Sequence, residues 1–340
     1  MRLDPSESTV LARSSSSDES TVRAWVARTV RELAVHDWLV FTYLSILVLA
    51  TLQGAGPHRD KCLEQTTGLL MLMVASMALV RGGILRDRFF APMLYRVGVY
   101  GTVQASYFVL RDLLPTVSSR ALDEHLYALD VRVFGVEPTL WVDRFVSSAT
   151  TEWFSFFYFN YFALLAVHVL PMLFVTKRTA LLQEFALAVL FVFCTAHVLY
   201  MIVPGYGPYR LLADQYQHAL PRGTWYSLVL DAVNAGGAQK DIFPSLHTAA
   251  PTTIALFSFR HRDKLPFKYS WPLVAFFAAN IIGATIFLRW HYAIDVLAGL
   301  TLATVGVTLA ARVRPLEQAW RKRDGLGPVW PTFPWSTPKA

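Results

Sequence analysis

Charged residues and cysteines are both scarce in this sequence of 340 residues. Asp, Glu, Lys and Arg make up 16% of it and hydrophobic residues 54%, whereas soluble domains carry roughly 25% charged residues. The two cysteines, Cys62 and Cys194, are too few for a disulfide framework or a metal site. The polar, Ser-rich start has no apolar run followed by a small-residue cleavage site, so we expect no cleavable signal peptide. These absences favour a chain whose main solvent is lipid.

Positive charge is in excess, with a net charge of +7. The basic residues are not gathered in one stripe with stacking aromatics, so we expect no nucleic-acid partner. They lie instead in short runs between apolar stretches, as the positive-inside rule predicts for membrane proteins.

Apolar stretches recur along most of the chain. A membrane-spanning helix needs about 20 mostly apolar residues, with a range of about 17–25. The pattern predicts an all-α protein, a polytopic transmembrane helix bundle with about eight spans. These are residues 37–53, 66–81, 91–114, 153–175, 180–203, 245–260, 270–288 and 292–312.

The distribution of Lys and Arg predicts an orientation for these eight spans. With a cytoplasmic N-terminus, 20 of the 31 Lys and Arg residues fall on the cytoplasmic side and nine on the other. This bias favours an integral, multi-pass membrane protein with both termini in the cytoplasm.

Two outer loops are long. In residues 115–152, Leu122, Leu126, Leu129 and Val133 recur at helical spacing between charges, which predicts an amphipathic helix in the membrane interface. Residues 204–244 are rich in Gly, Pro, Tyr and Asn and show no apolar period. The tail 315–340 is rich in proline, which argues against a helix there. A Phe- and Tyr-rich stripe at 154–162 is interpreted as packing.

Three segments are predicted to meet on the outer face: PGYGPYR at 204–210, KDIFPSLHTAAPT at 240–252 and LRWHYAIDVLAG at 288–299. His291 and Asp295 lie four residues apart at a helix start, so they share one face and the carboxylate can orient the imidazole. His247 follows Pro244 and Ser245 at another helix start, where backbone N–H groups attract phosphate. We therefore expect His247, His291 and Asp295 to be catalytic.

Other residues of these segments are candidates for binding. Arg210, Lys240 and Arg289 carry charges that suit phosphate oxygens, and Ser245 stands at the helix start beside them. Tyr206 and Tyr209 are candidate substrate-binding residues, although aromatic residues are also common at membrane interfaces. A single interfacial histidine is more often structural, so the joint placement of the trio carries the interpretation.

The sequence resembles a known family at these motifs. PSLHTA at 244–249 and RWHYAIDVLAG at 289–299 resemble the second and third signatures of the type 2 phosphatidic acid phosphatase (PAP2) superfamily. The pieces FGVEPTLW, FPSLH and HYAIDVLAG are similar to the inositol phosphorylceramide synthase and sphingomyelin synthase branch. The usual first signature, with a Lys and an Arg-Pro, is absent, and GYGPYR occupies its place.

The resemblance implies a domain organisation. Residues 1–36 would form a cytoplasmic segment, disordered at its start, and residues 37–90 two extra spans. Residues 91–312 would form a six-span PAP2-like catalytic core with outer loops 115–152 and 204–244. Residues 313–340 would form a cytoplasmic tail. The active site would lie on the extracytoplasmic face.

The resemblance also implies a mechanism without metal or cofactor. His291 would attack phosphorus to form a phosphohistidine, Asp295 would orient it, and His247 would protonate the departing group. Arg210 would hold the phosphate, with Arg289 and Lys240 as further candidates. The partners would be a phospholipid donor and either a lipid hydroxyl or water as acceptor.

We expect a lipid phosphotransferase that moves a phosphoryl or phosphoalcohol head group, such as inositol phosphate, between lipids. One alternative is a lipid or polyprenyl phosphate phosphatase. Another is a protein that binds or transports lipid without catalysis. Sites for transport usually lie near mid-membrane, whereas these histidines are predicted at one face.

Overall fold

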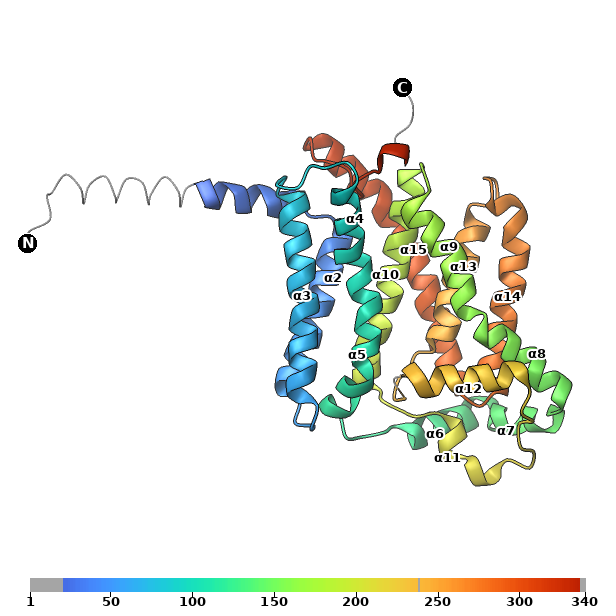
Figure 1. Cartoon of the computed structure of the whole chain (residues 1–340). Coiled ribbons are helices and arrows are strands. Elements are labelled where there is room, and N and C mark those ends of the chain that lie inside the picture. The colour runs from blue at the N-terminus through green and yellow to red at the C-terminus, as the bar shows by residue number, and fades with distance from the viewer. Residues whose placement is uncertain (1–20, 238, 337–340) are drawn as a thin grey trace, which may run out of the picture.

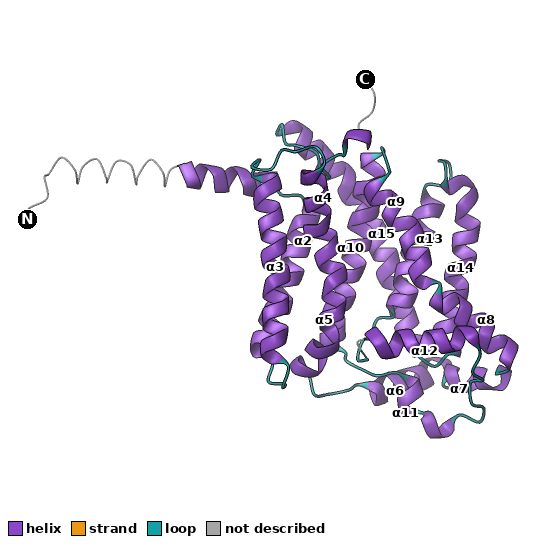
Figure 2. Cartoon of the chain, viewed as in Figure 1, coloured by secondary structure: helices purple, strands orange, loops and turns teal. Residues whose placement is uncertain are grey.

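The computed structural model describes residues 21–237 and 239–336. The chain is 77% helical, and the described residues form no strand (Figure 2), which confirms the all-α class. Six helical segments are long and apolar enough to cross a membrane. They are α2 (Val35–Gln53), α3 (Arg59–Arg81), α8 with α9 (Ser148–Phe159 and Tyr161–Phe174), α10 (Thr179–Ile202), α14 (Phe267–Phe287) and α15 (Ala293–Arg323).

Two further predicted spans form helices that are interrupted or short. Residues 91–114 fall on α4 (Phe90–Arg96), a π-helical segment (Val97–Gly101) and α5 (Thr102–Val117). Residues 245–260 fall on the short α13 (Leu246–Arg260). The π-helical segment contains Gly98, where a Cβ atom would lie 2.3 Å from the Ser76 side chain. Glycine there permits close contact with α3. Six segments of the described residues meet the length and hydropathy criteria for a span. The count of eight spans therefore stays a prediction.

The helix boundaries correct several predictions. The helix predicted to start at residue 66 starts at Arg59, and the one predicted from 153 starts at Ser148. The last helix passes the predicted end at 312 and continues through Pro315 to Arg323. The extension beyond residue 312 is stabilised by hydrogen bonds to the N-terminal part of the chain. The backbone N–H of Val35 donates to Glu317 (2.8 Å), and Arg321 donates to Glu32 (3.0 Å). Such contacts hold a helix that proline content alone argues against.

Short helices gather at one end of the bundle (Figure 1). They are α6 (Asp123–Phe134), α7 (Pro138–Val142), a 3-10 turn (Asp143–Phe145), α11 (Pro208–Leu211), a second 3-10 turn (Ala213–Gln215) and α12 (Thr224–Gly236). The predicted amphipathic helix is present as α6. Its buried face, however, carries Asp123 and Asp130 with Leu126, while Leu129 and Val133 are exposed.

Helix α12 corrects the prediction that residues 204–244 have no apolar period. Tyr226, Val229 and Val233 are spaced three and four residues apart and pack with Ala284 and Phe287 of α14. The Gly- and Asn-rich flanks hide this short apolar stripe from a composition-based reading, although the spacing is that of a helix face.

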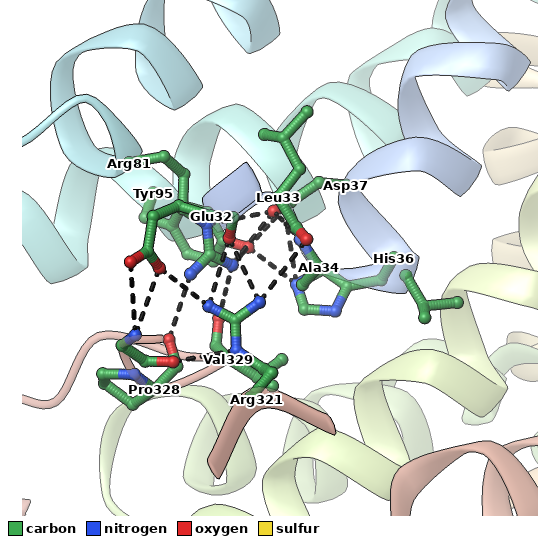
Figure 3. A network of polar contacts seen from close by, with 12 residues as sticks. Glu32, Leu33, Ala34, His36, Asp37, Arg81, Tyr95, Arg321, Pro328 and Val329 are labelled. Atoms are coloured by element: carbon green, nitrogen blue, oxygen red, sulfur yellow. Dashed lines mark hydrogen bonds and ion pairs between the residues drawn. The ribbon is translucent and has the colours of Figure 1, made fainter. Parts of the chain in front are cut away.

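The opposite end of the bundle is closed by the C-terminal segment after α15, which ends in a 3-10 turn (Pro334–Ser336). Arg81 donates to Asp37 (3.0 Å) and to the carbonyls of Pro328 (3.0 Å) and Val329 (2.7 Å), as Figure 3 shows. Trp330 is buried and stacks on His36, with ring centroids 4.8 Å apart. The tail thus joins the two N-terminal spans to the rest of the bundle. Of the predicted N-terminal segment, residues 1–20 lie outside the described residues, and residues 21–32 form a helix.

Candidate active site

The three predicted outer-face segments meet through backbone hydrogen bonds. The N–H of Ser245 donates to the carbonyl of Asp295 (3.1 Å), and that of Tyr209 donates to the carbonyl of Arg289 (2.9 Å). Gly205 and Asp241 form an isolated parallel bridge. Backbone contacts alone therefore hold together segments that lie far apart in the sequence.

His247 and His291 face each other at this junction. Their ring centroids lie 6.2 Å apart, with an angle of 48° between the ring planes. His247 is the second residue of α13, and His291 lies two residues before α15. The two imidazoles are thus close enough for one small group, such as a phosphoryl group, to contact both.

Asp295 lies beside His291. Its Oδ2 is 3.5 Å from Nδ1 of His291 and accepts a hydrogen bond from the N–H of Tyr292 (3.0 Å). Nδ1 of His291 and Oδ1 of Asp295 are both buried without a hydrogen-bond partner among the described residues. The pair is in reach but not hydrogen bonded. Catalytic hydrogen bonds are often loose without substrate and tighten when it binds.

Burial determines the charge state of His291, which is 4% exposed. Burial lowers the pKa of His291 to about 4, although the nearby Asp241 carboxylate and the Ile242 backbone carbonyl both raise it. A buried imidazole loses solvation that its charged form needs. His291 is therefore neutral at pH 7, which is the form that can act as a nucleophile.

His247 is held between two tyrosines. The ring of Tyr158 from α8 is stacked on it at 4.3 Å and 11°, and that of Tyr161 from α9 lies 4.3 Å away at 39°. Both tyrosines belong to the stripe at 154–162 that was interpreted as packing. They also line the cavity beside the histidines, so that interpretation is incomplete.

Helix α6 positions two of the converging segments with its buried carboxylates. Asp123 accepts hydrogen bonds from the N–H groups of Tyr206 (3.0 Å) and Gly207 (2.7 Å). Asp130 accepts from those of Ala293 (2.6 Å) and Ile294 (2.7 Å), at the start of α15. Charge-assisted bonds of this kind are strong. Helix α6 thus fixes both the GYG turn and the helix that carries Asp295.

A cavity of about 590 Å³ opens beside the histidines. Its walls come from α5, α8, α9, α10, α12 and the three converging segments. The aromatic and polar residues in its lining are Gln104, Tyr107, Phe108, Tyr158, Phe159, Tyr161, Phe162, Phe193, Tyr200, Tyr206, Tyr209, Gln239, Asp241, His247, Trp290 and His291. The Gln104 Nε2 and Trp290 Nε1 donors are buried without partners among the described residues.

The predicted binding residues divide into two groups. Tyr206 and Tyr209 line the cavity. Arg210 is exposed next to them, with its guanidinium 3.8 Å from the centroid of the Tyr206 ring. The structure places these three residues together at one rim of the site.

The other predicted residues point elsewhere. Lys240 is buried and donates to the carbonyls of Ser118 (3.0 Å) and Arg120 (3.2 Å). Arg289 donates to Asp143 (2.7 Å) and lies over Tyr216 at 3.8 Å.

Ser245 is also engaged. It is fully buried, and its hydroxyl accepts the N–H of Thr248 (3.2 Å) as the N-cap of α13. Lys240, Arg289 and Ser245 do not line the cavity.

A profile of the PAP2 superfamily matches residues 124–309, more than half of the chain. The chain belongs to the PAP2 superfamily. No curated protein and no solved structure shows a significant match to it. The matched range of this superfamily member contains all three converging segments and ends within α15.

Sequence reasoning missed one acidic residue of the site. Asp241 lines the cavity, and its carboxylate accepts a hydrogen bond from Tyr107 (3.1 Å). A signal was present, because Asp241 stands six residues before His247 in the same quoted segment. Of the two neighbouring charged residues, Lys240 bonds the carbonyls of Ser118 and Arg120, and Asp241 is the one that lines the cavity.

Proposed function

We propose that this PAP2-superfamily protein is a membrane-embedded lipid phosphotransferase that works through a phosphohistidine on His291. The observation that carries the proposal is one continuous cavity that joins the facing histidines to an apolar region between the helices. Phosphate chemistry and a hydrocarbon chain can both be accommodated there. Superfamily membership supports phosphatase or phosphotransferase activity.

The apolar part of the cavity supports a lipid substrate. Phe108 of α5, Phe162 and Leu165 of α9 and Phe193 of α10 line it. Phe108 and Phe162 are 72% and 58% exposed on the helix bundle, where they would contact lipid. A hydrocarbon chain lying between α5 and α9 would keep apolar contact from the bilayer to the histidines.

The proposed reaction has two balanced steps. In the first, a nitrogen of neutral His291 forms a bond to phosphorus, the bond from phosphorus to the departing alcohol oxygen breaks, and His247 gives that oxygen a proton. In the second, His247 takes the proton of the acceptor hydroxyl, whose oxygen bonds to phosphorus as the nitrogen–phosphorus bond breaks. Histidine suits both roles because its imidazole can give a proton in one step and take one in the next.

Phosphate binding is proposed for Arg210 at the rim. Its guanidinium has no ion-pair partner among the described residues and rests on Tyr206, so its donors remain available for phosphate oxygens. The indole N–H of Trp290 is a second, neutral donor at the cavity. Lys240 and Arg289 would need to leave their present partners to join them.

The site is proposed to face the extracytoplasmic side, with both termini in the cytoplasm. The excess of Lys and Arg in the loops opposite the histidines supports this orientation. Transfer to a lipid acceptor, rather than to water, is supported by the aromatic walls around His247 and by α12 forming one side of the cavity. Water as acceptor would give the phosphatase reaction instead.

The proposal is tested by trapping the phosphoenzyme. Purified protein is incubated with phospholipid labelled in its phosphate and quenched in alkali, where phosphohistidine survives. We expect labelled protein in the wild type and none in His291→Ala, with turnover reduced by at least about 1000-fold, as for other nucleophile removals. His125→Ala is the matched control, because His125 is an exposed histidine at the same end of the bundle.

Adding a hydroxylated lipid separates the two acceptors. A transferase converts label into a new lipid when the acceptor is present and releases little water-soluble phosphate without it. Rapid release independent of acceptor would favour the phosphatase reaction. Labelling of His291→Ala protein at the wild-type level would exclude His291 as the nucleophile.

A further inference from the structure

Asp241 is a carboxylate that the two-step chemistry does not use. It lies in the segment between α12 and α13, where it forms an isolated parallel bridge with Gly205. Lys240 turns toward the carbonyls of Ser118 and Arg120, and Asp241 turns into the cavity.

The other carboxylates around the site have structural partners. Asp123, Asp130 and Asp295 each accept hydrogen bonds from backbone N–H groups at the start of a turn or helix. Asp241 has a single side-chain donor, the hydroxyl of Tyr107 at 3.1 Å. Among the described residues that line the cavity there is no Lys or Arg. A carboxylate in such surroundings gains most from a ligand that brings hydrogen-bond donors.

The aromatic lining indicates which donors fit. Tyr158 and Tyr161 present ring faces to His247. Tyr206 is covered by Arg210 at 3.8 Å, and Tyr209 lies against Trp290 at 4.9 Å. A quaternary ammonium group binds to open aromatic faces, and these four tyrosines each have a face already engaged.

Tyrosine side chains that line the cavity also carry hydroxyl groups, which can form hydrogen bonds with a ligand. Tyr158 and Tyr161 line the same cavity as Asp241, and no hydrogen bond of their hydroxyls is present in the described part of the chain. The amide of Gln104 is likewise unpartnered in its wall. A carboxylate, hydroxyls and an amide together match the alternating donors and acceptors of a polyol.

We propose that Asp241 is a specificity-determining residue that accepts hydrogen bonds from the hydroxyls of a polyol head group carried on the transferred phosphate. This inference rests on the proposed phosphotransferase function and names its donor class: a phospholipid with a hydroxyl-rich, uncharged alcohol, such as an inositol ring. Tyr107 is a positioning residue that fixes the carboxylate. A head group with a second phosphate would meet the negative charge of Asp241 and be disfavoured.

Kinetics on two donors test this role. Turnover of phosphatidylinositol and phosphatidylcholine is measured for wild type, Asp241→Asn and Asp241→Ala, with Asp214→Asn as the control for an exposed carboxylate at the same end. We expect Asp241→Ala to lower kcat/KM on phosphatidylinositol at least about tenfold, mostly through KM, because a charged acceptor is lost. Any turnover of phosphatidylcholine should change less than that of phosphatidylinositol, since choline is attracted by the charge of the carboxylate but has no hydroxyl or N–H donor for it. Asp214→Asn should match wild type on both donors.

Binding separates this inference from the proposed function. In a His291→Ala background, affinity for glycerophosphoinositol and glycerophosphocholine is measured by calorimetry, with and without Asp241→Ala. We expect the His291→Ala protein to bind the inositol compound more tightly than the choline compound. Adding Asp241→Ala should lower the affinity for the inositol compound at least about tenfold and remove this preference. If wild type turns over neither lipid, the proposed function fails, while this measurement still decides the role of Asp241. Equal losses on both ligands, unchanged affinity or no binding would each overturn the inference.

Discussion

At one end of the bundle, Arg81 and Arg321 donate to carboxylates and carbonyls of three chain segments. At the other, His247 and His291 face a cavity of about 590 Å³. Both ends bury charged residues in a protein surrounded by lipid. At the closed end, His36 Nδ1 and Trp330 Nε1 are among the buried side-chain atoms that have no partner in the described part of the chain. At the end that holds the cavity, the unpartnered atoms include Nδ1 of His291, Nε2 of Gln104 and Nε1 of Trp290, whose residues line the cavity.

The difference shows how to separate structural from functional polar groups in this protein. Partners supplied by the chain itself indicate a role in folding, as for Asp37 with Arg81 and Asp130 with the start of α15. Groups without partners at a cavity, such as Nδ1 of His291 and the amide of Gln104, indicate a role in binding a ligand. Three predictions sharpen this comparison.

The largest stability effect is expected at the closed end. Arg81→Ala leaves Asp37, which is fully buried, without its ion-pair partner. Breaking one side of a buried pair costs about 3–5 kcal/mol. We expect a marked decrease in melting temperature in detergent, with kcat/KM of the folded fraction within about twofold of wild type because the cavity is untouched.

Arg86→Ala is the matched control for this variant. Arg86 is exposed and bonds only the nearby carbonyl of Gly83 (2.8 Å), so its loss should change stability by less than about 0.5 kcal/mol. If Arg81→Ala were as stable as Arg86→Ala, the closed end would not be the structural lock that its contacts indicate.

The second prediction concerns the acid side of the pH–rate profile. Attack needs neutral His291, and burial lowers its pKa to about 4. As pH falls, kcat/KM on a phosphodiester donor should therefore decline near pH 4 rather than near the ordinary histidine value of about 6.5. A diester carries one negative charge throughout this range, so its own titration does not interfere.

Asp241→Asn sharpens this test. Burial raises the pKa of Asp241 itself, and in its ionised form its carboxylate raises the pKa of His291. Replacing this ionised form by an amide should move the decline to lower pH. The control Asp214→Asn should leave it unmoved. A decline that stays near pH 6.5 in every variant would contradict a buried, desolvated His291.

Most of the helices follow from single apolar runs, because lipid requires about 20 apolar residues for each span. The convergence of His247, His291 and Asp295 could also be predicted, since counting spans places their segments on one face. Helix α12 was missed because its apolar stripe, centred on the buried Val229, is short and flanked by glycine.

Pairing partners could not be predicted. Whether Arg289 faces substrate or Asp143 depends on a contact between residues far apart in sequence. The same holds for Lys240 and the carbonyls of Ser118 and Arg120. Residue type shows that a cation is available, but only the fold determines which acceptor it meets.

The smallest effect is expected for replacement of Ser245. Ser245 is a candidate for phosphate binding by sequence, yet its hydroxyl caps α13 through the N–H of Thr248 (3.2 Å). Ser147 caps α8 through Thr150 at the same distance, and it does not line the cavity. If both serines act only as caps, Ser245→Ala and Ser147→Ala should each lose about 1 kcal/mol of stability. Their turnover should then agree within about threefold. Turnover more than about tenfold lower in Ser245→Ala alone would mean that this hydroxyl contacts phosphate during the reaction, and that a group with a partner in the chain can still belong to the functional class.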